Sequence, residues 1–281
     1  MLIKLFMLWL RINAVLKPHS NIIVQPYSGR VVRQILFKLA SILGLNDFLN
    51  ILSSNAPFKP YSFTPLFLDG KPLYKSPDDS NPLILYADKR YRFTFSYILN
   101  NVDDIVFLKG FQGSVEIYGS RKIDLVLDRI NVIDESMMDL GLKYGDYVKM
   151  VFVTPTLLQL PKIRKMSKIN RYMLFPIPSL IFYSLKRHWN TYAEKKIRLE
   201  TWRTNYSLRV VNYSLRPRTV LYDKDAEIRG FIGYTIFQIL SRGKNILEKI
   251  SKLLYYATIV NIGKSRSIGF GVTKIKHINM I

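Results

Sequence analysis

The apolar segments of this chain occur in the same order twice, once on each side of an acidic segment at residues 134–145. The first set begins with an apolar run at residues 2–14, which predicts a buried strand, and a loop at residues 21–27 follows. Ser28 then stands at the N-cap of a helix whose apolar residues recur with helical spacing over residues 31–43. Further strands are predicted at residues 61–68, 84–86, 90–98, 115–118 and 123–133, with a short helix at residues 102–109.

The second set repeats this order in the rest of the chain. Pro176 and Pro178 mark the start of its first helix, and residues 223–225 form a turn between two of its strands. The predicted elements are a strand at residues 147–154, a helix at residues 179–196, strands at residues 207–221 and 227–239, a helix with an apolar stripe over residues 246–257, and a strand at residues 270–278.

Both sets follow the order β-α-β-β-α-β, which is the ferredoxin-like order. The sequence therefore predicts an α+β fold of two tandem ferredoxin-like (RRM-like) domains, over residues 1–140 and 146–281. RNA-recognition modules use the same scaffold when aromatic and basic side chains occupy an open face of the sheet. The fold alone leaves the function open.

The charge of the chain points to a polyanionic partner. Lys and Arg number 42 against 20 Asp and Glu, a net charge of +22, and the resulting positive potential attracts nucleic acid. A basic protein of ribosome or membrane surfaces is the alternative. Cysteine is absent, which excludes disulfides, thiolate zinc sites and a cysteine nucleophile. The apolar opening at residues 2–10 lacks a small-residue cleavage site and is too short to span a bilayer, so we expect a cytoplasmic protein without membrane contact.

The most specific motif lies between the last predicted helix and the last predicted strand. Residues 263–271 hold three glycines and two cations, and glycines let backbone N–H groups approach an anion closely. Lys264 and Arg266 add charged donors, so a phosphate of an RNA backbone is the expected ligand, with a solvated turn as the alternative. The order helix, loop, strand disagrees with a Walker A loop, which disfavours nucleotide hydrolysis.

This glycine-rich segment resembles the C-terminal loop of the CRISPR-associated repeat-processing endoribonucleases, the sixth CRISPR-associated protein family. Three other segments resemble the same family: residues 60–65 (PYSFTP), 152–158 (FVTPTLL) and 228–233 (IRGFIG). The resemblance implies cleavage of CRISPR repeat RNA without a metal or cofactor, by attack of a ribose 2′-hydroxyl on the adjacent phosphate. The products would be a cyclic phosphate and a 5′-hydroxyl. It also implies repeat RNA and subunits of a CRISPR effector complex as partners, for a monomer or homodimer.

The histidines of this chain depart from the family pattern. Many members carry a His in or just after the first helix, whereas residues 27–59 contain none. We expect surface or core roles for His19, His188 and His277. The sequence resembles instead a His-lacking archaeal branch, which implies catalytic roles for the cations Arg30, Arg33, Lys59, Arg229 and Arg266. The predicted RNA-binding residues are Lys38, Gly263, Lys264, Ser265, Gly269 and Gly271.

Basic side chains of this kind are poor proton acceptors near neutral pH, because the pKa of Lys is about 10.4 and that of Arg exceeds 12. They can stabilise the negative charge that develops on the phosphate in the transition state. A catalytic site without His also leaves the alternative of a non-cleaving RNA-binding subunit of a CRISPR effector complex.

Overall fold

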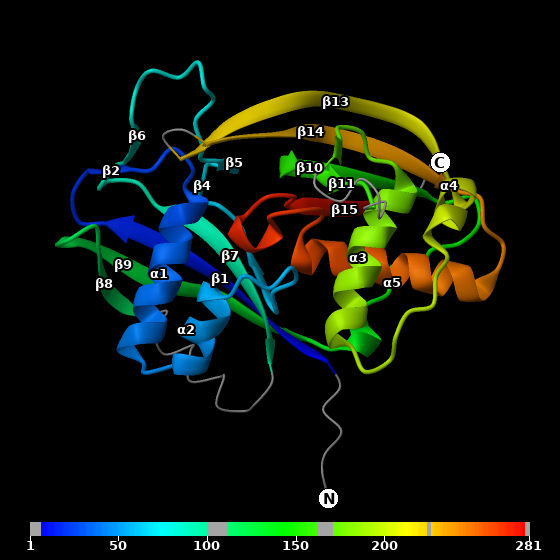
Figure 1. Cartoon of the computed structure of the whole chain (residues 1–281), viewed down its shortest axis with the longest axis horizontal. Coiled ribbons are helices and arrows are strands. Elements are labelled where there is room, and N and C mark those ends of the chain that lie inside the picture. Colours follow the sequence, from blue (N-terminus) through cyan, green and yellow to red (C-terminus); the bar gives the residue numbers. More distant parts are fainter. Residues whose placement is uncertain (1–6, 100–111, 162–170, 224–225, 279–281) are drawn as a thin grey trace, which may run out of the picture.

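The computed structural model describes residues 7–99, 112–161, 171–223 and 226–278. The chain forms two halves, each an antiparallel sheet with helices on one face, and they lie side by side in Figure 1. In the first half β1 lies at the centre of the sheet, between β7 and β9. Its elements are β1 (Leu8–Pro18), β2 (Ile22–Val24), α1 (Gly29–Ile42), α2 (Asn46–Ser53), β3 (Tyr61–Phe63), β4 (Phe67–Leu68), β5 (Lys71–Pro72), β6 (Leu83–Leu85), β7 (Tyr91–Leu99), β8 (Gly113–Ile117) and β9 (Arg121–Ile133).

The second half has the sheet order β13-β14-β10-β15, with α3 and α5 in the crossovers. This is the ferredoxin-like topology, so the predicted fold class is confirmed. Its elements are β10 (Tyr147–Thr156), β11 (Leu158–Gln159), β12 (Tyr172–Met173), α3 (Pro178–Tyr192), α4 (Thr204–Ser207), β13 (Leu208–Asp223), β14 (Ala226–Ile239), α5 (Lys244–Val260) and β15 (Thr273–Ile278). None of the helices in the described ranges is long and apolar enough to cross a membrane.

Several local predictions in the first half differ from the structure. The loop predicted at residues 21–27 contains β2, which pairs with β6, and the predicted strand at residues 61–68 is divided into β3 and β4. The helix α2 was not predicted. The Ser28 hydroxyl does not cap α1, because it donates to the Leu73 carbonyl at 2.6 Å and accepts from the Leu66 N–H at 3.0 Å. The helix predicted at residues 102–109 lies outside the described residues.

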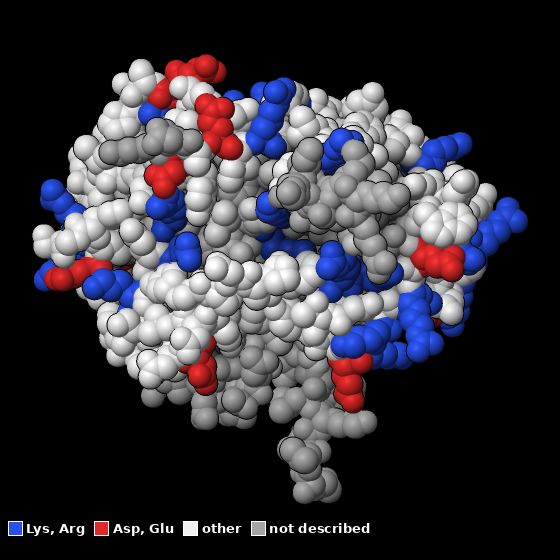
Figure 2. Space-filling view, in the orientation of Figure 1, with Lys and Arg blue, Asp and Glu red and all other residues white. Residues whose placement is uncertain are grey.

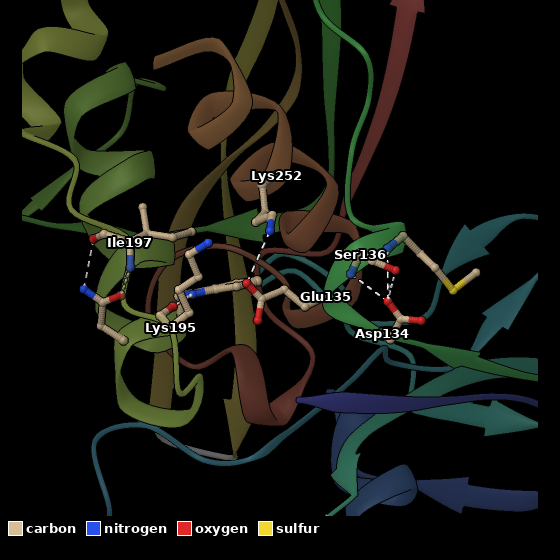
Figure 3. A network of polar contacts seen from close by, with 9 residues as sticks. Asp134, Glu135, Ser136, Lys195, Ile197 and Lys252 are labelled. Atoms are coloured by element: carbon tan, nitrogen blue, oxygen red, sulfur yellow. Dashed lines mark hydrogen bonds and ion pairs between the residues drawn. The ribbon is translucent and has the colours of Figure 1, made fainter. Parts of the chain in front are cut away.

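In the second half, the first helix and the last strand are shorter than predicted. α3 ends at Tyr192 instead of residue 196, because the Asn190 side chain accepts from the Ile197 N–H at 2.8 Å and donates to its carbonyl at 3.2 Å. These two bonds hold Ile197 against the last turns of the helix, and Figure 3 shows Ile197 in these contacts. The last strand begins at Thr273, since the glycine-rich segment before it turns in the left-handed region. The turn predicted at residues 223–225 is described only at Asp223.

The acidic segment between the halves is docked onto α5. The Asp134 carboxylate accepts from the Ser136 N–H at 2.6 Å and begins a 3₁₀ turn, and Glu135 forms an ion pair with Lys252 at 3.3 Å (Figure 3). The Leu140 N–H donates to the Ser251 hydroxyl at 2.6 Å. One apolar core continues across this segment, because Trp9 of β1 is fully buried in the cluster of the second half. The two halves are therefore packed directly against each other.

Candidate functional site

The segment from Asn261 to Gly271, which we call the glycine loop, connects α5 to β15 where the two halves meet (red in Figure 1). Gly263 and Gly271 have φ values of +82° and +69°, which favour glycine. A Cβ at Gly271 would lie 1.8 Å from the Ile262 carbonyl oxygen, and one at Gly263 would lie 2.2 Å from that of Leu157. Both positions admit only glycine, and the loop is tightly packed.

The glycine loop is held against the first half by contacts on both of its sides. The Asn261 side chain donates to the Phe63 carbonyl at 3.0 Å, and Phe270 stacks on Tyr27 with ring centroids 4.5 Å apart. At the start of α1, a Cβ on Gly29 would lie 2.5 Å from the Ile268 carbonyl oxygen, so glycine permits this close approach. The loop therefore keeps a fixed position relative to α1 and β3.

Two predicted cations of the first half meet at one backbone oxygen. Lys59 Nζ donates to the Leu52 carbonyl at 2.9 Å, and Arg33 Nη2 lies 3.4 Å from the same atom. Lys59 also donates to the Tyr61 hydroxyl at 3.3 Å, which lies beside the side chain of Ser267 in the glycine loop. Burial, and then the positive charge of Arg33, lower the pKa of Lys59. Neither cation forms an ion pair with a carboxylate of the described residues, so an anion would be favoured beside them as a counter-charge.

Arg266 of the glycine loop is a buried guanidinium, 7% exposed. Its Nη2 donates to the Ser184 hydroxyl at 3.3 Å, and its Cζ lies 5.6 Å from the centre of the Phe58 ring. Its Nη1 is buried without a hydrogen-bond partner among the described residues. Burial lowers the pKa of Arg266 to about 10, so the group stays charged at neutral pH. An unpaired donor of this kind is unfavourable unless a ligand supplies an acceptor.

A pocket of about 160 Å³ joins these groups across the junction. Four cations line it: Lys59, Arg187, Lys264 and Arg266. Gly263 and Ser265 line it as well, and Arg33 lies next to Lys59. On the face shown in Figure 2, Lys and Arg side chains gather along the middle of the molecule and over α3. A phosphate in this pocket could therefore receive hydrogen bonds from cations of both halves of the chain.

Sequence reasoning missed Arg187 of α3. Its guanidinium carbon lies 5.1 Å from the Phe58 ring centre and 5.5 Å from that of Tyr183. The only local signal for Arg187 is its place three residues after Ser184, on the same side of the helix.

Lys264, which was predicted, is exposed and donates to the Tyr172 hydroxyl at 2.7 Å.

The other predicted residues lie away from this pocket. Arg30 forms an ion pair with Asp223 at the end of β13. Lys38 is exposed on α1 and lines a second groove together with Arg30 and Arg33. Arg229 is exposed on β14, paired in register with Thr219 of β13, and is not among the residues that line either the pocket or this groove. Gly269 and Gly271 shape the glycine loop without lining the pocket.

His188 is a buried residue that positions the chain at Lys59. Its Nε2 lies 2.9 Å from the Lys59 carbonyl oxygen and its Nδ1 lies 2.7 Å from the Tyr256 hydroxyl. Because a carbonyl can only accept, Nε2 carries the proton and Nδ1 accepts from Tyr256. His19 and His277 pair at the surface with Asp124 and Asp146. The surface and core roles expected for the three histidines agree with these contacts.

The protein is expected to lose stability below pH 6.5 because of His188. Burial, followed by the charge of Arg266, lowers the pKa of His188 well below its usual 6.5. The unfolded chain then binds a proton that the folded protein does not, so each pH unit below 6.5 costs up to about 1.4 kcal/mol. Urea unfolding at pH 7.5 and 5.0 measures this loss. His188→Gln, which keeps an N–H donor but does not titrate, should show a smaller loss, and an equal loss in both proteins would contradict the assignment.

Comparisons with known proteins agree with this arrangement. The Cas6 N-terminal domain family matches residues 10–133, and the CRISPR-associated endoribonuclease Cas6 family matches residues 150–273. The CRISPR-associated endoribonuclease Cas6 1 of Saccharolobus solfataricus is 21% identical over 93% of this chain and 94% of its own length.

Solved structures share the fold over nearly the whole chain. A Cas6 product complex has a TM-score of 0.69 at 18% identity, covering 95% of this chain and all of that one. Cas6 of Thermus thermophilus has a TM-score of 0.64 at 16% identity, covering 97% of this chain and 99% of that one. Since the two family matches together span most of the sequence, this chain belongs to the Cas6 family of CRISPR-associated endoribonucleases, which process CRISPR repeat RNA.

Proposed function

We propose that this protein cleaves CRISPR repeat RNA without a metal ion, by attack of a ribose 2′-hydroxyl on the adjacent phosphate. The observation that carries the proposal is the meeting of Arg33 and Lys59 at the Leu52 carbonyl, beside the pocket that Arg266 lines. A phosphate bound there would replace the carbonyl as acceptor and receive donors from both halves of the chain.

The chemistry follows from the groups in this pocket. The 2′-oxygen forms a bond to phosphorus while the bond to the 5′-oxygen breaks, which leaves a cyclic phosphate and a 5′-hydroxyl. In the transition state, negative charge accumulates on the phosphate oxygens, and Arg33, Lys59 and Arg266 stabilise this charge. Lys59, whose pKa is lowered, donates the proton that the departing 5′-oxygen needs. The 2′-hydroxyl proton is released to solvent.

Incubation of the purified protein with repeat RNA in excess EDTA tests this mechanism. We expect one cut, with a cyclic phosphate on the upstream product, identified by mass spectrometry. The control is the same RNA with a single 2′-deoxyribose at the cut, which has lost the nucleophile and should remain intact. Cleavage of the deoxy RNA at the same position, or a requirement for a divalent cation, would refute the mechanism.

A non-cleaving RNA-binding subunit is the second candidate function. It is favoured by the residues that line the pocket, since no histidine is among them in the described part of the chain. The same experiment separates the two candidates, because this subunit would bind repeat RNA tightly and form no product. The site residues, the partner subunits and the state as monomer or homodimer stay predictions.

A further inference from the structure

A second groove lies on the outer side of α1, next to the candidate site. It has a volume of about 560 Å³ and runs between α1 and the turn that joins β8 to β9. This volume falls within the roughly 300–1,000 Å³ of small-ligand sites. Arg33 lines this groove and also contacts the Leu52 carbonyl that Lys59 shares. Arg33 therefore links the groove to the proposed cleavage cluster.

The groove combines ring faces with amide groups. Phe37 and Tyr118 supply aromatic surfaces, and Gln25 and Gln34 supply amides that both donate and accept hydrogen bonds. The Tyr118 hydroxyl lies 3.4 Å from Gln25 Oε1, which makes this bond weak and easily exchanged. Gln34 Oε1 is buried and has no hydrogen-bond partner among the described residues. Proteins read unpaired bases with this combination of rings and amides.

Tyr118 adopts an unfavourable backbone conformation at the wall of the groove. Its φ is +49°, in the left-handed region, where Gly and Asn are tolerated and bulky residues are rarely found. Strained residues of this kind gather at ligand sites, where the side chain has a use that offsets the strain. The Tyr118 ring therefore occupies a turn position whose backbone conformation would favour Asn.

The charges at the groove suit a nucleotide that carries its phosphate. Arg30 is paired with Asp223, whereas Arg33 and the exposed Lys38 form no ion pair with the described residues. We infer that the groove binds one unpaired nucleobase of the substrate RNA against Tyr118 and Phe37. Its edge meets Gln25 and Gln34, and its phosphate meets Arg33 and Lys38. This inference rests on the RNA binding of the proposed function and adds a base-specific subsite to it.

Tyr118→Asn removes the ring and relieves the backbone strain, which offsets part of the packing that Tyr118 makes against the core of the first half, and urea unfolding establishes that the variant is folded under the assay conditions. We expect it to bind an uncleavable deoxy-substituted repeat RNA about tenfold more weakly, the size of one lost base-stacking contact. Tyr144→Asn is the matched control, since Tyr144 is 51% exposed and lies in the acidic segment between the halves. It should bind RNA as the native protein does. Unchanged binding by Tyr118→Asn would overturn the inference.

A scan of abasic sites through the same RNA identifies the base. At one position, loss of the base should weaken binding by the native protein about tenfold and leave binding by Tyr118→Asn unchanged. Equal effects on both proteins at every position would overturn the inference. The inference would also be overturned if the groove bound free mononucleotides but no abasic position affected RNA binding by the two proteins differently. The scan measures binding only, so the EDTA experiment decides the cleavage mechanism independently.

Discussion

Lys59→Met is expected to cleave repeat RNA about 100- to 1,000-fold more slowly than the native protein, the usual loss when one transition-state donor is removed. Lys59 lines the pocket, and it also shares the Leu52 carbonyl with Arg33. Methionine keeps the apolar length of the side chain but supplies neither charge nor proton. Single-turnover cleavage with RNA at saturating concentration measures the change in rate.

The stability of Lys59→Met should be unchanged or higher. Since burial lowers the pKa of Lys59, the charged ammonium is less favourable in the folded protein than in the unfolded chain. Urea unfolding therefore separates loss of chemistry from loss of fold. Lys122→Met on β9, where the lysine is exposed, serves as the control and should cleave at the native rate. A Lys59→Met protein that is equally stable and cleaves normally would remove Lys59 from the mechanism.

Arg266→Met is expected to stabilise the free protein while it weakens cleavage about 100-fold or more. The guanidinium is buried, no carboxylate among the described residues forms an ion pair with it, and its Nη1 has no hydrogen-bond partner there. A buried unsatisfied donor costs about 1–3 kcal/mol, which an apolar side chain of similar length would recover. Stability and activity should thus change in opposite directions at this residue.

Thermal unfolding with and without uncleavable RNA tests this expectation. RNA binding should raise the melting temperature of the native protein more than that of Arg266→Met, because the phosphate satisfies the free Nη1 only in the native protein. Arg266→Lys is the control that keeps the charge and loses the planar fork. If Arg266→Met were less stable than the native protein and responded equally to RNA, Arg266 would have only a structural role.

The tandem fold could be predicted because its signals are local. On α1 most of the apolar stripe with helical spacing is the face that the structure buries, with Val31, Val32, Ile35, Leu36 and Leu39 at 2% exposure or less, whereas Ile42 at the last turn is 67% exposed. The glycine loop is a similar case, since Gly263 and Gly271 occupy positions where a Cβ would collide with backbone. Such features depend on the residue itself and on its near neighbours in the chain.

The composition of the candidate site could be predicted only in part. Arg30 and Arg33 lie three residues apart on one helix, yet Arg30 is held by Asp223, 193 residues away, while Arg33 lies next to Lys59. Arg229, chosen for the glycine beside it, is exposed on β14 away from the pocket, and Arg187 carried no signal strong enough to be selected.

The sequence by itself determined the α+β class, the repeated order of elements, the positive charge and the need for glycine in the loop. Spacing along the chain is sufficient to specify which face of an element is apolar. The tertiary structure alone decided which cations converge, because His188 holds the Lys59 backbone from 129 residues away and the packing of the halves buries Arg266. Contacts between residues so distant in sequence depend on how two folded surfaces meet, and no local pattern records that.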